Sequence, residues 1–131
     1  MTHVDISIGF GEAFDRLTIL RLKAARLAGE KQHRAAEEAR DLEARLLAAL
    51  EWDTLEGVQA INELHAVNSR LWEIEDRLRA MDKAGDFGVG FVAAAKDVYN
   101  LNDERARLKQ TTDLILRSDV REVKGYGDDG C

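Results

Sequence analysis

Apolar residues recur every three or four positions over most of the chain, which is the period of amphipathic α-helices. The clearest example lies between residues 64 and 81, where the apolar positions are Leu64, Val67, Leu71, Ile74, Leu78 and Met81. Asn68 and Glu75 lie one turn beyond Leu64 and Leu71, on the flank of this apolar stripe. Their polar groups would be partly buried there, so we expect them to need hydrogen-bonding partners.

The same spacing predicts four helices joined by short turns. The first runs from Glu12 to about Ala28 and is apolar around most of its circumference, which predicts a central position in the fold. Gly29 then has the place of a C-terminal glycine. The other helices are predicted from Lys31 to Leu50, from Asp53 or Thr54 to Met81, and from Asp86 or Phe87 to Leu116.

Two short segments near the ends of the chain look like strands. Val4, Ile6 and Ile8 alternate with polar neighbours, and residues 119–126 combine alternation with β-branched side chains. A lone strand is not stable, so the two segments are predicted to pair beside the helices. The expected fold is mainly α: a four-helix, bundle-like domain over residues 1–126 with a small two-stranded sheet, followed by a flexible tail at 127–131.

Composition narrows the class of protein. The 131 residues allow one domain, and the absence of proline fits long uninterrupted helices. The net charge is −6 and the basic residues form no run, which argues against a nucleic-acid-binding face. No apolar run approaches about 18 residues, and Asp5, Glu12 and Asp15 interrupt the N-terminal region, so we expect neither a membrane span nor a signal peptide but a cytoplasmic protein.

Catalytic residues cannot be assigned from the usual motifs. Cys131 is the one cysteine, so neither a disulfide within the chain nor a cysteine-based zinc motif is expected. His3, His33 and His65 fall on separate elements without a Ser-His-Asp context. We therefore assign no metal ligand.

Arg105 is the most informative single position, because it lies in the middle of the apolar stripe of the fourth helix. A buried charge needs a carboxylate partner. In a simple hairpin centred on Gly85, Glu75 and Arg105 are out of register by roughly 15 Å, whereas Asn68 and Asn102 are level. We therefore expect the carboxylate to come from the first helix, from Asp15 or Glu12.

Three interpretations of these polar positions remain open. One is a structural network that fixes the register of the helices. Another is a pocket for a polar small molecule or for the side chain of a protein partner. The third is a Mg²⁺-dependent hydrolase of a nucleotide-like phosphate substrate, in which Glu12 with Asp15 and Glu73 with Asp76 hold the metal, as acid pairs do in all-α nucleotide pyrophosphatases. The candidate ligand-binding set is Glu12, Asp15, Lys23, Asn68, Trp72, Glu75, Asp76, Asn102, Asp103 and Arg105.

The chain also resembles a family of short bacterial proteins that are classed as a conserved domain of unknown function. The resemblance extends over nearly the whole chain, with Gly9 and Phe10 inserted after the strand-like segment and Arg16 where a lysine is usual. The residues that carry it are Ile6-Ser7-Ile8, Gly11-Glu12, Asp15, Leu17-Thr18-Ile19-Leu20, Lys23, Val67-Asn68, Leu71-Trp72, Ile74-Glu75-Asp76, Phe91, Ala94, Val98-Tyr99, Asn102-Asp103-Glu104-Arg105, Lys109 and Val123 to Tyr126.

The resemblance implies no activity of its own. It implies an accessory role, because similar proteins are found beside glycosyltransferase and surface-polysaccharide functions. Together with the helical pattern, it favours a non-enzymatic accessory or binding protein without a cofactor, with the Mg²⁺-dependent hydrolase as the alternative. A homo-oligomer is compatible with both.

Overall fold

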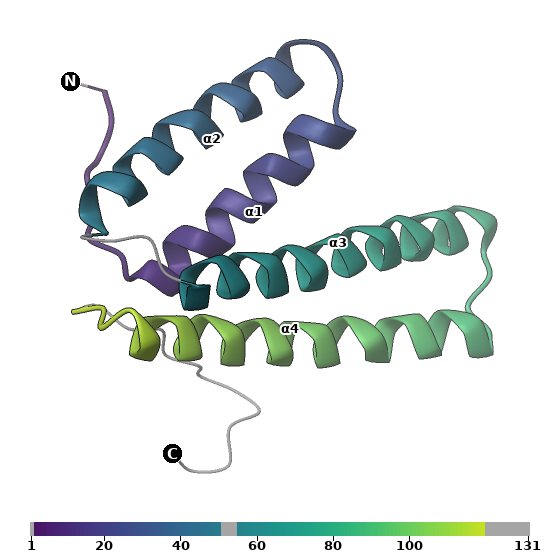
Figure 1. The fold of residues 1–131 in the computed structure, drawn as a ribbon. Coiled ribbons are helices and arrows are strands. Elements are labelled where there is room, and N and C mark those ends of the chain that lie inside the picture. Colours follow the sequence, from purple (N-terminus) through teal and green to yellow (C-terminus); the bar gives the residue numbers. More distant parts are fainter. Residues whose placement is uncertain (1, 51–54, 120–131) are drawn as a thin grey trace.

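The computed structural model describes residues 2–50 and 55–119 of the chain, and four α-helices make up most of this part (Figure 1). All four predicted helices are present, and their ends lie within a few residues of the predicted limits. They are α1 (Phe10–Arg26), α2 (Gly29–Ala49), α3 (Leu55–Ala84) and α4 (Val89–Ile115).

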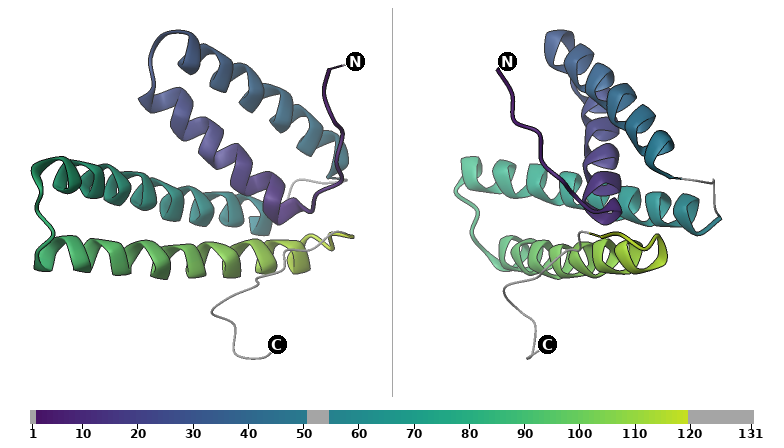
Figure 2. Two further views of the ribbon diagram at one scale, coloured as in Figure 1. Left: turned by 180° about the vertical axis from the view of Figure 1, so that it is seen from behind. Right: turned by 90° about the vertical axis from the view of Figure 1, so that its left-hand side faces the viewer.

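The helices form two hairpins that meet at α1. In its described part the chain brings α1 against α2, α3 and α4, whereas α2 packs closely on α1 alone. Figures 1 and 2 show the α1–α2 hairpin rising from one end of the longer α3–α4 hairpin, so that the opposite end of α3–α4 extends beyond it. The predicted central position of the first helix is therefore confirmed.

Two groups of buried apolar side chains hold the hairpins together. The first joins α1 to its neighbours through Phe14, Leu17 and Leu64. The second lies between α3 and α4 and includes Leu71 and Leu101. Leu64 and Leu71 belong to the apolar stripe that the sequence predicted for α3, so this stripe supplies much of the core. Full burial of one such side chain stabilises a fold by about 1.5–3 kcal/mol. Within the described residues, no helix is long and apolar enough to cross a bilayer.

Glycines with positive φ mark both hairpin turns. Gly85 (φ 70°) ends α3, and its N–H donates to the carbonyl of Asp82 while the N–H of Asp86 donates to that of Met81. This pair of bonds is the Schellman arrangement, which explains why α3 continues three residues past Met81. Gly29 (φ 67°) follows α1 as predicted, but it is also the first residue of α2.

The predicted two-stranded sheet is wrong. Residues 2–9 lead into α1 without forming a strand, and no strand occurs elsewhere in the described residues. Val4 and Ile6 are 84% and 65% exposed, so their alternation with polar residues does not correspond to a buried face. Among residues 2–50 and 55–119, no neighbouring strand supplies the hydrogen bonds that an extended segment requires. Residues 120–126 of the predicted partner strand, like the predicted tail at 127–131, lie outside the described residues.

Candidate functional site

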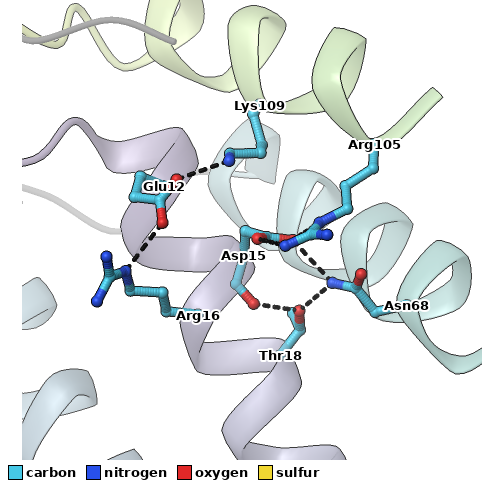
Figure 3. A network of polar contacts seen from close by, with 7 residues as sticks. All are labelled: Glu12, Asp15, Arg16, Thr18, Asn68, Arg105 and Lys109. Atoms are coloured by element: carbon cyan, nitrogen blue, oxygen red, sulfur yellow. Dashed lines mark hydrogen bonds and ion pairs between the residues drawn. The ribbon is translucent and has the colours of Figure 1, made fainter. Parts of the chain in front are cut away.

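A buried carboxylate lies at the point where α1 crosses α4. The Asp15 side chain is 1% exposed, and Arg105 binds it through two hydrogen bonds, Nε to Oδ1 at 2.9 Å and Nη2 to Oδ2 at 2.6 Å (Figure 3). A buried charge is tolerated only when it is paired and hydrogen-bonded, and the guanidinium matches a carboxylate with two parallel bonds. The expectation that Arg105 pairs with a carboxylate of the first helix is thus confirmed, with Asp15 as the partner.

Asn68 and Thr18 complete the contacts around Asp15. Asn68 Nδ2 donates to Asp15 Oδ1 at 2.8 Å and lies 2.9 Å from Thr18 Oγ1, while the Thr18 hydroxyl donates to the Asp15 carbonyl at 2.8 Å. No buried side-chain nitrogen or oxygen of the described residues lacks a hydrogen-bond partner. We call Asp15, Thr18, Asn68 and Arg105 the Asp15 network; it ties α1, α3 and α4 together.

A second ion pair lies one helical turn away. Lys109 Nζ is 2.6 Å from Glu12, and Arg16 Nε donates to the same carboxylate at 2.9 Å (Figure 3). Partial burial acts to raise the pKa of Glu12, but the hydrogen bonds and positive charges of Lys109 and Arg16 outweigh it and hold that pKa below its usual value. Glu12 with Lys109 and Asp15 with Arg105 therefore form successive pairs along antiparallel helices.

The first turn of α1 is bound by side chains from the end of α4. The buried Asp113 accepts the Gly11 N–H at 2.7 Å and the Ser118 hydroxyl at 3.0 Å, and Ser118 Oγ accepts the Phe10 N–H at 2.9 Å. The N-cap residue Gly9 makes no side-chain cap of its own. Helix N–H groups that have no partner within their helix are therefore satisfied from α4.

An open cleft of about 230 Å³ begins beside the Asp15 network. Asn68 and Arg105 form part of its wall, and both are already bound to Asp15. We call it the central cleft, because α1, α3 and α4 all contribute to it. Its lining residues are Ile19, Leu22, Asn68, Leu71, Trp72, Glu75, Asn102 and Arg105.

Three polar side chains of the central cleft are not used by the network. The Trp72 indole N–H and the Asn102 carboxamide make no hydrogen bond to another described residue, and Glu75 has only a 3.8 Å ion pair with Arg79. Trp72 is held from outside by Arg26, whose guanidinium lies 5.7 Å from the ring centroid. The polar groups of Trp72, Glu75 and Asn102 therefore remain available to a ligand in the cleft.

The structure brings together six of the ten predicted site residues, all in the Asp15 network or the central cleft. Glu12 lies beside the network with Lys109, and Asp103 is partly buried on α4 without lining the cleft. Asp76 is exposed, 3.6 Å from Arg79, and Lys23 lines a different cleft, between α1 and α2. The six are Asp15, Asn68, Trp72, Glu75, Asn102 and Arg105.

Several contributors were missed by the sequence reading: Thr18, Lys109, Asp113, Ser118 and Arg26. One of them, Lys109, carried a usable signal. Lys109 stands one turn after Arg105, and Glu12 stands one turn before Asp15, so antiparallel pairing of α1 with α4 predicts the second ion pair once the first is known. The hydrogen bonds from Asp113 and Ser118 involve backbone groups and leave no such pattern.

The acid pairs that were considered as Mg²⁺ ligands have other partners. Asp15 and Glu12 bind Arg105 and Lys109, while Glu73 lies 3.5 Å from Arg26. Among the described residues, no group of three His, Cys, Asp or Glu side chains is arranged to hold a metal ion. The geometry therefore offers no observation in favour of the hydrolase alternative.

The sequence model of a family of unknown function, DUF6165, matches residues 3–129. The chain belongs to this family. No curated protein and no solved structure matches the chain. The DUF6165 match includes all four helices and every residue of the central cleft.

Proposed function

We propose that the protein is a non-enzymatic binding protein, and that its central cleft receives a neutral or basic polar group of a small molecule or a partner protein. The observation that carries this proposal is the division of the polar residues into two parts. The members of the Asp15 network are hydrogen-bonded to one another. By contrast, Trp72, Glu75 and Asn102 line the open cleft and make no hydrogen bond to the network. The cleft volume of about 230 Å³ suits a group of side-chain size.

The chemistry of the three available groups defines the ligand. Asn102 can both donate and accept, Trp72 can only donate, and an ionised Glu75 can only accept. Arg105 is closely paired with Asp15, whereas Glu75, at 3.8 Å from Arg79, has only a long ion pair and is the carboxylate that lines the cleft. An amide or a guanidinium satisfies this set, whereas a carboxylate would be repelled by Glu75.

The Asp15 network supports this site by fixing its walls. Binding groups need neighbours that hold their geometry, and the network holds α1, α3 and α4 at a fixed distance from one another. The family resemblance implies an accessory role for this protein next to glycosyltransferase or surface-polysaccharide functions. The proposal includes this role, because an accessory protein acts by binding rather than by catalysis.

Nuclear magnetic resonance titration tests the proposal. The probes are methylguanidinium, propionamide and propionate, and the signals followed are the Trp72 indole N–H, assigned with Trp72→Phe, and the Asn102 side-chain amide. We expect methylguanidinium and propionamide to shift both signals and propionate to shift neither.

The matched variants are Asn102→Ala and Asn100→Ala, because Asn100 is exposed on α4 only two residues away and does not line the cleft. Asn102→Ala should remove the shift of Trp72 and Asn100→Ala should keep it. The proposal fails if no probe shifts these signals, or if the two variants behave alike.

A further inference from the structure

A second cleft, of about 240 Å³, lies between α1 and α2. Its apolar floor is formed by Leu20, Leu27 and Ala35, and its charged lining by Lys23, Lys31, Arg34 and Glu38. We call it the hairpin cleft. Leu27 and Lys31 of its lining lie near the connection between α1 and α2. This connection points away from the α3–α4 hairpin (Figures 1 and 2).

In the part of the chain that the structure describes, the basic side chains of the hairpin cleft have no acidic partner. Lys23, Lys31 and Arg34 are exposed, and none of them forms an ion pair with a described residue. Other bases of α1 do form such pairs, among them Arg16 with Glu12 and Arg26 with Glu73. Three unpaired positive charges around one cleft stand out in a chain whose net charge is −6, and they create a local positive potential.

The first two turns of α2 form one wall of the hairpin cleft. Lys31 and Arg34 lie in these turns, and the acidic Glu30 of the first turn does not line the cleft. Gln32 Nε2 donates to the Ala24 carbonyl of α1 at 3.2 Å, which holds the two walls of the cleft together.

We infer that the hairpin cleft binds a phosphate monoester attached to an apolar body. Three positive charges and the one negative charge of Glu38 leave a lining of two net positive charges, which matches the charge of about −1.5 to −2 of a phosphate monoester near neutral pH. The floor of Leu20, Leu27 and Ala35 offers apolar contact that inorganic phosphate cannot use. The ligand is therefore an amphipathic phosphate, either as a single dissolved molecule or as the headgroup of a membrane lipid.

Titration calorimetry on the full chain tests this inference. The soluble probes are dihexanoyl phosphatidic acid below its micellar concentration, dihexanoyl phosphatidylcholine and inorganic phosphate. Co-sedimentation then uses vesicles of phosphatidylcholine with and without phosphatidic acid. We expect phosphatidic acid to bind in at least one of the two forms, and binding of the soluble form or of the vesicles identifies the source of the ligand.

Two triple variants provide the comparison. Lys23→Gln/Lys31→Gln/Arg34→Gln removes the basic lining, whereas Lys83→Gln/Lys96→Gln/Arg107→Gln removes the same charge from exposed positions of the α3–α4 hairpin. The first should weaken binding at least about tenfold and the second much less, because only the first removes charge-assisted hydrogen bonds to the ligand. Melting curves check that both variants are folded.

Leu27→Gln tests the apolar floor, because Leu27 is only partly buried and its replacement changes no charge. This variant should weaken binding of phosphatidic acid and leave any response to inorganic phosphate unchanged. The inference is overturned if phosphatidic acid binds in neither form, if both triple variants weaken binding equally, or if inorganic phosphate binds as tightly as the amphiphile.

Discussion

The Asp15 carboxylate is buried away from water, and its neighbours compensate for the lost hydration. Arg105 supplies the opposite charge and Asn68 a further hydrogen bond. Breaking a buried ion pair by removing one partner is much more costly than the pair is worth, because the remaining charge is left without compensation. Asp15 and Arg105 should therefore behave as a unit when they are substituted.

Arg105→Met is expected to lower the free energy of unfolding by about 3–5 kcal/mol, because it leaves the Asp15 carboxylate buried without a counter-charge. The double variant Asp15→Asn/Arg105→Met should recover a large part of that loss, since it removes both charges. Urea denaturation measures both values. Arg107→Met is the control, because Arg107 is exposed on the same helix and its replacement should change stability by less than about 0.5 kcal/mol.

Equal losses in the single and the double variant would show that the packing of the Arg105 side chain, rather than its charge, stabilises the fold. Such a result would remove Asp15 from the centre of the network. The double-mutant cycle therefore measures the coupling between the two residues and not the effect of either one alone.

The lowered pKa of Glu12 predicts how the stability of the fold depends on pH. Lys109 and Arg16 hold its pKa below the usual value of 4.5 in the folded protein, so the unfolded chain takes up a proton at a higher pH than the folded one. The stabilisation by ionised Glu12 is complete at neutral pH and is lost as the pH falls below about 4.5 through the folded pKa. The wild type should therefore be more stable than Glu12→Gln at pH 7, and the difference should shrink in acid.

Thermal melts at several pH values between 7 and 3 measure this difference. Glu104→Gln serves as the control, because Glu104 is exposed on α4. Its difference from the wild type should stay small throughout. A constant gap between the wild type and Glu12→Gln over the whole range would contradict the role assigned to Lys109 and Arg16.

At the scale of the secondary-structure elements, α1 lies close against α4 at Gly11. A Cβ atom on Gly11 would lie 2.2 Å from the backbone oxygen of Lys109, which cannot rotate away. Gly11 is thus required for its lack of a side chain, and not for an unusual backbone conformation. Its position allows its own N–H to reach Asp113 and the Glu12 carboxylate to reach Lys109.

Gly11→Ala is expected to destabilise the fold by about 1–3 kcal/mol, the usual cost of overpacking, although alanine is the better helix former by about 1 kcal/mol. The matched control is Gly90→Ala at the start of α4, where the new Cβ would lie 3.7 Å from Met81 Cε, an ordinary contact. That variant should be neutral or more stable by up to about 1 kcal/mol. Denaturant unfolding of both variants distinguishes the effect of a close contact between helices from a general effect of replacing glycine. Equal stability of the two variants would contradict the close contact of Gly11 with α4.

The sequence was sufficient to predict the helices, because their apolar period is strong and each turn contains glycine or polar residues. It also predicted that Arg105 would pair with α1, since the hairpin register places Glu75 too far along α3. It failed for residues 3–8, where an alternating pattern was taken for a strand although Val4 and Ile6 are exposed. A short alternation describes a strand only if a second strand lies beside it, and that is a property of the whole fold.

The candidate site was predictable only in part. Asn68 and Glu75 were found because polar residues on the flank of an apolar stripe require an explanation, and Asn102 because it is level with Asn68 in the hairpin. Trp72 was found among the residues that carry the family resemblance. Which of these residues join the Asp15 network and which line the cleft depends on the point where α1 diverges from the α3–α4 hairpin. Helical periodicity gives no information about that point. Lys23 lines the hairpin cleft together with residues of α2, and helical periodicity does not contain this placement either.

In the molecule as a whole, α1 separates the two proposed binding sites. Its residues Ile19 and Leu22 line the central cleft, whereas Leu20 and Lys23 line the hairpin cleft. The two clefts differ in charge, because the carboxylate of Glu75 lines the first and three bases line the second. The two proposals together predict that the protein holds a basic or amide group and a phosphate at the same time on two sides of one helix.

The bonds from Asp113 and Ser118 to the start of α1 also bear on how the chain is made. They join residues separated by 102 and 108 positions in the sequence. A ribosome therefore releases α1 long before the residues that complete its first turn have been synthesised. Until then, the N–H groups of Phe10 and Gly11 can bond only to water or to earlier parts of the chain, so the capping of the first helix is completed by residues near the other end of the molecule.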